Sequence, residues 1–198
     1  ITKKISENFF KFGINVITSG NHIWYNREIL DYINSESRLL RPANMSSKLP
    51  GYGYGVYKVL NKKICVINLM TNLFMTKSNN VFQTAKNLTK KFILKRNVDF
   101  IIVDIHGEYA AEKMALAHLF DGKVTSVFGS HTHIPTADQM ILSKGTSYQT
   151  DLGMCGDYNS VIGLKKNIYL NKMLNIKNFS KNSPSMGKAS ICGSIINA

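Results

Sequence analysis

The sequence predicts an α/β fold, a sandwich of β-sheets flanked by helices, in a single domain. Short runs of β-branched and apolar residues alternate along the chain with longer stretches whose apolar residues recur at helical spacing. Several of the short runs end at a glycine or a polar residue. With 198 residues, of which 44% are apolar, the chain can bury one core. Because open α/β sheets bind ligands at the carboxyl ends of their strands, we expect the functional site there.

The first third of the chain predicts two helices and a strand. Apolar residues recur at helical spacing over residues 1–12, and Gly13 stands where a helix would stop. The apolar run at residues 14–17 that follows is expected to form a strand. Asn26 is expected to cap a second helix over residues 27–33, whose apolar residues share one face.

The middle of the chain predicts a β-hairpin and then a helix, a strand and another helix. The runs at residues 56–60 and 64–69 are separated by a short turn, which is the pattern of two antiparallel strands. An amphipathic helical pattern covers residues 81–94. Residues 100–103 are the most strand-like run in the chain, and the helical pattern over residues 108–120 ends at an Asp-Gly pair.

The last third of the chain predicts strands, one helix and a loop. Residues 123–128 form a run of β-branched and apolar residues that ends at a glycine, and residues 147–151 are expected to form a strand that ends at an aspartate. Residues 165–174 are expected to be helical. Residues 177–188 are polar and contain a proline and a glycine, so we expect a loop. A final edge strand is expected over residues 190–196.

The chain is strongly basic, with a formal net charge of +13 from 25 basic and 12 acidic side chains. Such a charge makes nucleic acid and anionic membranes candidate partners. However, only four of the 25 basic residues are arginine, the side chain that recognises phosphate in a bidentate manner. The lysines are scattered among many asparagines, which favours a general compositional bias over a dedicated binding surface.

The cysteines and the hydropathy pattern indicate a cytoplasmic protein. Cys65, Cys155 and Cys192 are odd in number and far apart in the sequence, so neither a disulfide framework nor a thiolate zinc site is predicted. This usage fits a reducing compartment. No apolar run reaches the roughly 18 residues that a membrane-spanning helix needs, and the N-terminus does not resemble a signal peptide. We therefore expect no membrane partner.

Histidines stand at several of the predicted strand ends. Four of the five histidines follow this pattern: His22, His106, His131 and His133. The fifth, His118, lies within a predicted helix and is expected to have no part in a site. Side chains two residues apart in an extended backbone leave from the same side, so His131 and His133 can reach one centre. Neutral imidazoles together with the amide oxygen of Asn21 favour a borderline transition metal over calcium, and such a site suits hydrolytic chemistry.

Several motifs resemble those of a known enzyme family. Gly20-Asn21-His22, the later single histidine and Gly129-Ser130-His131-Thr132-His133 resemble the signature of the calcineurin-like metallophosphoesterase superfamily. More narrowly, the chain is similar to the bacterial YmdB-like metallophosphoesterases. This similarity extends along nearly all of the chain and rests on Gly20-Asn21-His22-x-Trp24, Arg41-Pro42-Ala43-Asn44, Asp104-x-His106-x-Glu108, His131-Thr132-His133-x-x-Thr136-Ala137-Asp138 and Thr150-Asp151-x-Gly153-Met154.

The resemblance implies a cytoplasmic phosphodiesterase that acts on cyclic nucleotides and related phosphodiesters, built on a sandwich of two β-sheets flanked by helices. It also implies that Asn21, His106 and His131 would bind one metal ion and that His133 would bind another. The cofactors would be two divalent transition-metal ions, in the first place Mn or Fe, with Zn as an alternative. A metal-bridging hydroxide would attack phosphorus, and His22 would be the general acid that protonates the leaving oxygen.

The chain departs from this family at its N-terminus. Family members begin with a strand that carries a metal-binding Asp and a second strand that carries a bridging Glu next to an Asn, and neither is found here. Asp31 and Glu36 follow the Gly-Asn-His motif and cannot replace them. We therefore expect residues 1–198 to be a single domain that is incomplete at the N-terminus and at the C-terminus, with the first strands missing. Without a bridging carboxylate, this chain is expected to bind metal poorly and to be inactive.

Three side chains near the motifs have open roles. Asp104 would either orient His106 from behind or cap the following helix. Asp151 is expected to fasten a turn, as strand-end aspartates often do. Arg41 would either pack a turn, which we favour, or hold a substrate phosphate.

A different class of function is also consistent with the sequence. The missing carboxylates and the charge of +13 would suit a basic RNA-binding or regulatory protein on a catalytically incomplete phosphoesterase scaffold. The candidate partners are then a small phosphodiester such as a cyclic nucleotide, RNA, and a second copy of the chain in a homo-oligomer.

Overall fold

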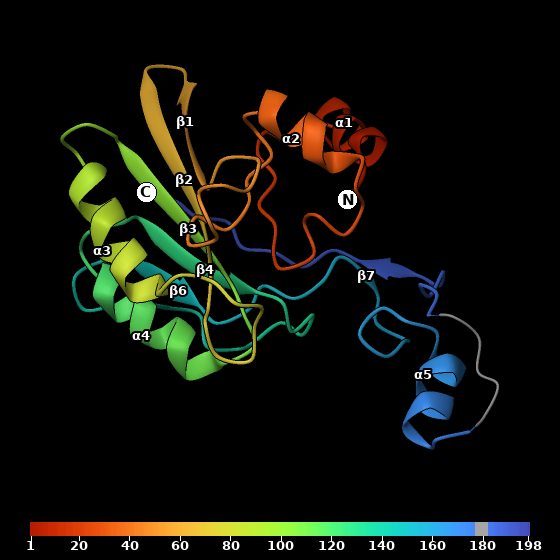
Figure 1. The fold of residues 1–198 in the computed structure, drawn as a ribbon. Helices are drawn as coiled ribbons and strands as arrows, with labels where there is room; N and C mark the ends of the chain where they lie inside the picture. Colours follow the sequence, from red (N-terminus) through yellow and green to blue (C-terminus); the bar gives the residue numbers. More distant parts are fainter. Residues whose placement is uncertain (177–181) are drawn as a thin grey trace.

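The central element of the structure is a six-stranded sheet (Figure 1). The computed structural model of the protein describes residues 1–176 and 182–198. The strand order in the sheet is β1-β2-β3-β4-β6-β5. Its strands are β1 (Tyr54–Val59), β2 (Lys62–Met70), β3 (Phe100–His106), β4 (Ser126–Ser130), β5 (Met140–Ile141) and β6 (Ser147–Gln149). A second sheet consists of two strands, β7 (Gly156–Asp157) and β8 (Ala189–Ser190).

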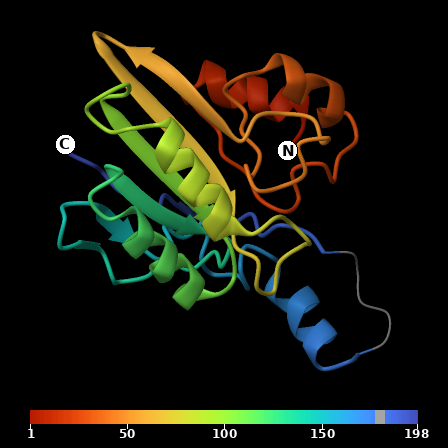
Figure 2. The ribbon, with the colours of Figure 1, turned by 60° about the vertical axis from the view of Figure 1, so that its left-hand side comes forward.

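Helices flank the large sheet, which confirms the predicted α/β class. The helices of the structure are α1 (Lys3–Lys11), α2 (Ile29–Ser35), α3 (Val81–Lys91), α4 (Ala110–Phe120) and α5 (Lys166–Met173), of which α5 projects away from the large sheet (Figure 1). α3 and α4 lie side by side against one face of the sheet in both ribbon views (Figure 2). Their buried apolar residues join those of β2, β3 and β4 in the main hydrophobic core. In the part of the chain that the structure describes, no helix is long and apolar enough to cross a membrane.

The central strands place their carboxyl ends at one edge of the sheet. β2 runs parallel to β3, and β3 runs parallel to β4. The register pairs Met70 with His106 and His106 with Ser130, so the three strands end level with one another. The loops that follow them therefore converge, as expected for the ligand-binding edge of an open α/β sheet.

The predicted elements with the clearest patterns are present with somewhat shifted ends. The predicted hairpin forms from β1 and β2, which pair antiparallel. The helix expected over residues 81–94 is α3, and the Asn80 side chain caps it by accepting from the Gln83 N–H at 2.9 Å. The strand expected over residues 100–103 is β3, which continues to His106. The regular spacing of apolar residues in the sequence therefore predicted these elements correctly.

Three helices, α1, α2 and α4, begin two residues later than predicted. α2 begins at Ile29, because the Asn26 side chain accepts from the Glu28 N–H at 3.2 Å and so stabilises a turn before the helix instead of capping it. α4 begins at Ala110. Glu108, which was predicted to be its first residue, stays outside the helix and reaches the site described below.

The prediction of a strand at residues 14–17 is wrong. Only Ile17 is paired there, through a single bridge to Leu39. The Ile17 N–H donates to Arg38 O at 2.8 Å, and the Ile17 carbonyl accepts from the Leu40 N–H at 2.8 Å. One bridging residue tethers the segment but does not make a ladder of backbone hydrogen bonds.

The prediction of an edge strand at residues 190–196 is also wrong. β8 ends at Ser190, and Ile191 and Ile195 are almost wholly exposed. An apolar run forms a strand only where a neighbour offers both backbone groups and a packing surface, and β7 offers two residues. Residues 177–181 of the loop predicted at residues 177–188 lie outside the described part of the chain.

The burial of β2 leads to a prediction about cysteine reactivity. Cys65 is fully buried in β2, and burial raises the pKa of its thiol to about 12, whereas Cys155 is exposed. Since the thiolate is the nucleophile, we expect iodoacetamide to modify Cys155 in the native protein and to leave Cys65 unmodified until the protein is unfolded. Peptide mass spectrometry measures both extents. Equal modification of the two thiols under native conditions would contradict the burial of β2.

Candidate metal centre

The carboxyl edge of the sheet brings together side chains from three parts of the chain. β3 ends at His106, and β4 ends at Ser130, one residue before His131. The side chain of Asn21 reaches the same place from a loop in the N-terminal segment. The structure thus joins three of the five residues that the sequence singled out.

Three possible metal-ligand atoms converge at this place. His106 Nε2 lies 3.1 Å from Asn21 Oδ1 and 3.1 Å from His131 Nδ1. The two imidazole rings have centroids 4.8 Å apart and cross at 78°. Ligand atoms around one transition metal lie roughly 3 Å apart, because each metal–nitrogen or metal–oxygen bond is about 2 Å long. The spacing therefore matches that of a ligand set.

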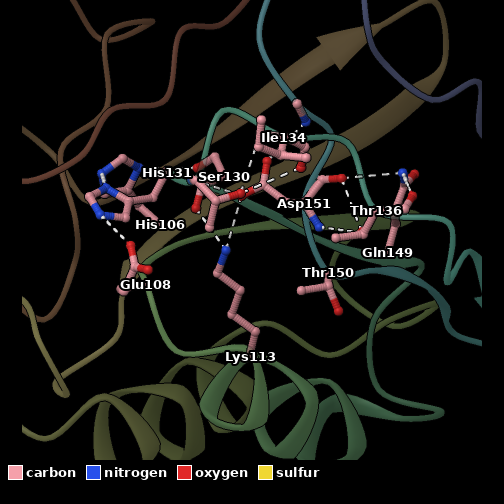
Figure 3. A network of polar contacts seen from close by, with 12 residues as sticks. His106, Glu108, Lys113, Ser130, His131, Ile134, Thr136, Gln149, Thr150 and Asp151 are labelled. Atoms are coloured by element: carbon pink, nitrogen blue, oxygen red, sulfur yellow. Dashed lines mark hydrogen bonds and ion pairs between the residues drawn. The ribbon is translucent and has the colours of Figure 1, made fainter. Parts of the chain in front are cut away.

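Hydrogen bonds on the outer side of each ring determine which nitrogen faces the centre (Figure 3). The Ser130 hydroxyl donates to Asp104 Oδ1 at 2.9 Å, so its oxygen is left to accept from His106 Nδ1 at 3.1 Å. His131 Nε2 lies 3.2 Å from Glu108 Oε2 and donates its hydrogen to that carboxylate. His106 Nε2 and His131 Nδ1 therefore both present lone pairs to the centre.

The chemistry of these atoms fits a divalent metal ion. Without a cation or a shared proton between them, the lone pairs of two nitrogens and one amide oxygen would repel one another. Burial lowers the pKa of His106 to about 3 and also lowers the pKa of His131, so both rings are neutral at pH 7, the form that binds metal. Among the described residues, no group of three or more His, Cys, Asp or Glu side chains could hold a metal ion. The set depends on the amide of Asn21, and its mixed nitrogen and oxygen atoms suit Mn, Fe or Zn.

Two motif glycines allow the close approaches that the centre requires. A Cβ atom at Gly20 would overlap the ring of His106. A Cβ atom at Gly129 would overlap the carbonyl oxygen of Thr150. A side chain at either position would therefore displace an imidazole or the strand next to it.

The turn that carries two of the histidines has an unusual backbone. His131 has a φ of +110° and His133 has a φ of +67°, a region that residues with a side chain rarely adopt. Each such residue costs on the order of 1–3 kcal/mol and persists only where surrounding contacts impose it. Thr132 lies between them, and its N–H donates to Asp151 Oδ2 at 3.1 Å.

A buried ion pair supports this turn (Figure 3). The Lys113 side chain in α4 is 0% exposed and that of Asp151 is 1% exposed. Lys113 Nζ lies 3.2 Å from Asp151 Oδ2 and donates to Ser130 O at 2.9 Å. Burial opposes ionisation of Asp151, but the N–H of Gly153 and the Lys113 ammonium together hold its pKa below the ordinary value. The pair is therefore charged, and it fixes both sides of the turn.

The other two predicted site residues lie outside this ligand set. His22 is exposed and lines a pocket of about 190 Å³ together with His106. His133 is also exposed, and its Nδ1–H donates to Ile162 O at 2.8 Å, which leaves Nε2 free. Neither side chain is hydrogen-bonded to the three converging atoms in the described residues.

The structure resolves the open roles of three side chains. Asp104 does not cap a helix; its buried carboxylate accepts from Ser130 and so orients His106 through that hydroxyl. Asp151 fastens a turn, as expected. Arg41 is buried and donates to backbone carbonyl oxygens of its own turn, which confirms the packing role.

Three residues that shape the centre received no role from the sequence: Glu108 and Ser130, which stand in its motifs, and Lys113, which does not. Lys113 precedes Leu116 and Phe120 by three and seven positions, so it stands on the buried face of α4. A lysine on an apolar helix face is a signal that could have been used. The role of Ser130 could not be derived from its place in the motif, because that role depends on contacts with a neighbouring strand.

The chain is similar to proteins of one family along its whole length. The family described as "YmdB-like protein" matches residues 1–198. The chain is 36% identical over 201 residues to the 2',3'-cyclic-nucleotide 2'-phosphodiesterase of Bacillus subtilis, in a match that covers 99% of this chain and 73% of that protein.

Two solved structures share both fold and sequence with the chain. A hypothetical protein from Thermus thermophilus matches with a TM-score of 0.87 and 31% identity, over 96% of this chain and 73% of that one. A protein from Mycoplasma pneumoniae, described as a novel phosphatase, matches with a TM-score of 0.84 and 35% identity, over 96% of this chain and 68% of that one.

Proposed function

The chain belongs to the YmdB-like family, and on this premise we propose that it is a metal-dependent phosphodiesterase whose substrates are cyclic nucleotides or related phosphodiesters. Phosphoester hydrolysis is the activity that the names of its relatives support. The observation that carries the proposal is the convergence of Asn21 Oδ1, His106 Nε2 and His131 Nδ1 at the carboxyl edge of the sheet.

In the proposed site, histidines and one asparagine would hold two divalent ions. Asn21, His106 and His131 would hold one ion. His133 would contribute its free Nε2 to a second, since its Nδ1 is engaged by a backbone carbonyl. The left-handed backbone at His131 and His133 supports this assignment, because strain of this kind is retained where function requires it.

The residues of the chain would orient the ions and transfer a proton. Bound divalent ions supply an activated water and offset negative charge on the phosphoryl oxygens. The Asp104 and Ser130 pair orients His106, and Glu108 orients His131, so the ligand nitrogens face the centre before any ion arrives. His22, in the pocket beside His106, would give a proton to the departing oxygen, which a poor leaving group needs.

Replacing His106 by alanine is expected to weaken manganese binding by on the order of 100-fold or more, because it removes the nitrogen that contacts both other ligand atoms. Manganese should raise the thermal midpoint of the wild-type protein by mass action and should raise that of the variant much less. Calorimetric titration measures manganese binding, and manganese-stimulated hydrolysis of bis-p-nitrophenyl phosphate measures the accompanying loss of activity.

The matched control for this experiment is His118→Ala. His118 is exposed in the last turn of α4 and should affect neither manganese binding nor hydrolysis. Wild-type affinity and turnover in the His106 variant would contradict the proposed site. Salt-sensitive RNA binding without manganese-stimulated turnover would favour the RNA-binding alternative instead, for which neither the fold nor the comparisons supply an observation.

A further inference from the structure

Two exposed aromatic side chains form a pair on the loops beside the metal centre. Phe74 is 81% exposed and Tyr109 is 44% exposed. Their ring centroids are 6.0 Å apart and the rings cross at 83°, an edge-to-face arrangement. Phe74 also has a φ of +60°, which is unusual for a bulky residue. An exposed apolar ring and a strained backbone both raise the free energy of the folded protein, so their occurrence at one residue indicates a function.

The exposure of Phe74 is imposed by the loop that carries it. The buried carboxylate of Glu112 accepts from the Asn72 N–H at 2.8 Å and from the Leu73 N–H at 3.0 Å. The Asn72 amide donates in turn to Asn79 O at 2.9 Å, which closes the loop on itself. The Glu112 carboxylate therefore fixes the backbone immediately before Phe74, and this fixed backbone holds the Phe74 ring in solvent.

The two rings stand on loops that leave the sheet at the same edge as the converging ligand atoms. β2 and β3 are parallel neighbours that end level, and beyond their ends the Thr71 N–H donates to His106 O at 3.0 Å. Phe74 follows three residues later. On the other loop, Tyr109 directly follows Glu108, whose carboxylate pairs with His131. Both rings thus stand within three residues of groups that contact the two ligand histidines.

We propose that Phe74 and Tyr109 form a subsite for the nucleobase of the substrate, an inference that rests on the proposed phosphodiesterase function. A phosphodiester bound at the metal centre would carry its sugar and base outward over the adjoining loops. A planar base can stack on an exposed aromatic ring whatever its hydrogen-bonding pattern, and the Tyr109 hydroxyl adds a polar group at the edge of the subsite. The pair would therefore recognise nucleotides as a class and would leave the identity of the base largely open.

The test compares a ligand that has a base with one that has none. In the manganese-loaded protein, Phe74→Ala is expected to weaken the binding of adenosine 3'-monophosphate by on the order of 10-fold or more, in line with the loss of one stacked base. Binding of inorganic phosphate should stay unchanged, because phosphate reaches only the metal centre. Calorimetric titration measures both affinities, and Phe74→Trp should restore nucleotide binding.

The matched control is Phe12→Ala, which removes an equally exposed ring, 83% exposed, at the end of α1. This variant should bind both ligands as the wild type does. Tyr109→Leu should weaken nucleotide binding and spare phosphate binding. Since the replaced rings are exposed, the thermal midpoints of the variants should stay near the wild-type value, which separates a lost subsite from a lost fold.

Each contrary result has a distinct meaning. If the wild-type protein binds the nucleotide no more tightly than phosphate, the subsite is refuted while the phosphodiesterase proposal stands. If Phe74→Ala weakens both ligands equally, the ring supports the metal centre and does not hold a base. If nucleotide binding is unchanged and the variant alters the oligomeric state, the pair is a protein contact. If the wild-type protein binds neither ligand, both proposals fail.

Discussion

Replacing Asp151 by alanine is expected to lower the free energy of unfolding by about 3–5 kcal/mol, the cost of leaving one member of a buried ion pair without its partner. The Lys113 ammonium, 0% exposed, would lose its counter-charge. The N–H groups of Thr132 and Gly153 would lose their acceptor at the same time. Urea denaturation at pH 7 measures the change. The same substitution should release the strained turn at His131, so metal binding should weaken with stability.

Two comparisons separate the buried pair from an ordinary ion pair. Asp99→Ala removes the carboxylate of an exposed pair with Lys62 and should have a much smaller effect. Removing both buried charges, in Lys113→Met combined with Asp151→Leu, should recover part of the stability, because apolar residues of similar volume leave no buried charge. A single Asp151→Ala variant as stable as the wild type would contradict the role given to the pair.

The pH dependence of stability offers a further check on Asp151. Its pKa in the folded protein is held below the ordinary value of 3.8. A carboxyl of this kind contributes stability that is complete above its unfolded pKa and is lost as the pH falls through its folded pKa. The wild type and the Asp151→Ala variant should therefore differ most near neutral pH and should converge under acid conditions.

Replacing His22 by alanine is expected to slow the hydrolysis of phosphodiesters with alkoxide leaving groups by about 10²–10⁴-fold, the usual contribution of a general acid. A nitrophenolate leaving group departs without a proton, so hydrolysis of bis-p-nitrophenyl phosphate should fall far less. His22 is suited to this role because it is exposed and lines the pocket beside His106. Steady-state rates with a 2',3'-cyclic nucleotide and with the nitrophenyl ester give the comparison.

A metal-ligand role for His22 would produce a different pattern. The loss of a ligand lowers both rates together and weakens manganese binding, whereas the loss of a general acid spares binding. Equal losses on the two substrates would therefore count against the general-acid role. His118→Ala, on the exposed side of α4, again serves as the control and should change neither rate.

The sequence predicted elements that depend on neighbouring residues, and it failed where an element depends on contacts between distant segments. The helix α3 was predictable because its apolar residues repeat within eleven positions and Asn80 caps its start. The apolar run at residues 14–17 shows the opposite case. Its composition suited a strand, yet only Ile17 is bridged to a neighbour, and no local pattern reports whether a neighbour is present. The pairing of Glu108 with His131 is likewise a contact between different elements, which no local pattern indicates.

The sequence by itself determined the fold class and the kinds of atoms available to the site, because apolar periodicity and the residues that end each strand are properties of adjacent positions. Only the tertiary structure decided how those atoms are used. Asn21 and His106 meet across 85 positions, and Lys113 and Asp151 meet across 38. The nitrogen that each ring presents to the metal centre is fixed by partners on other elements, and such long-range contacts exist only once the strands have paired in register.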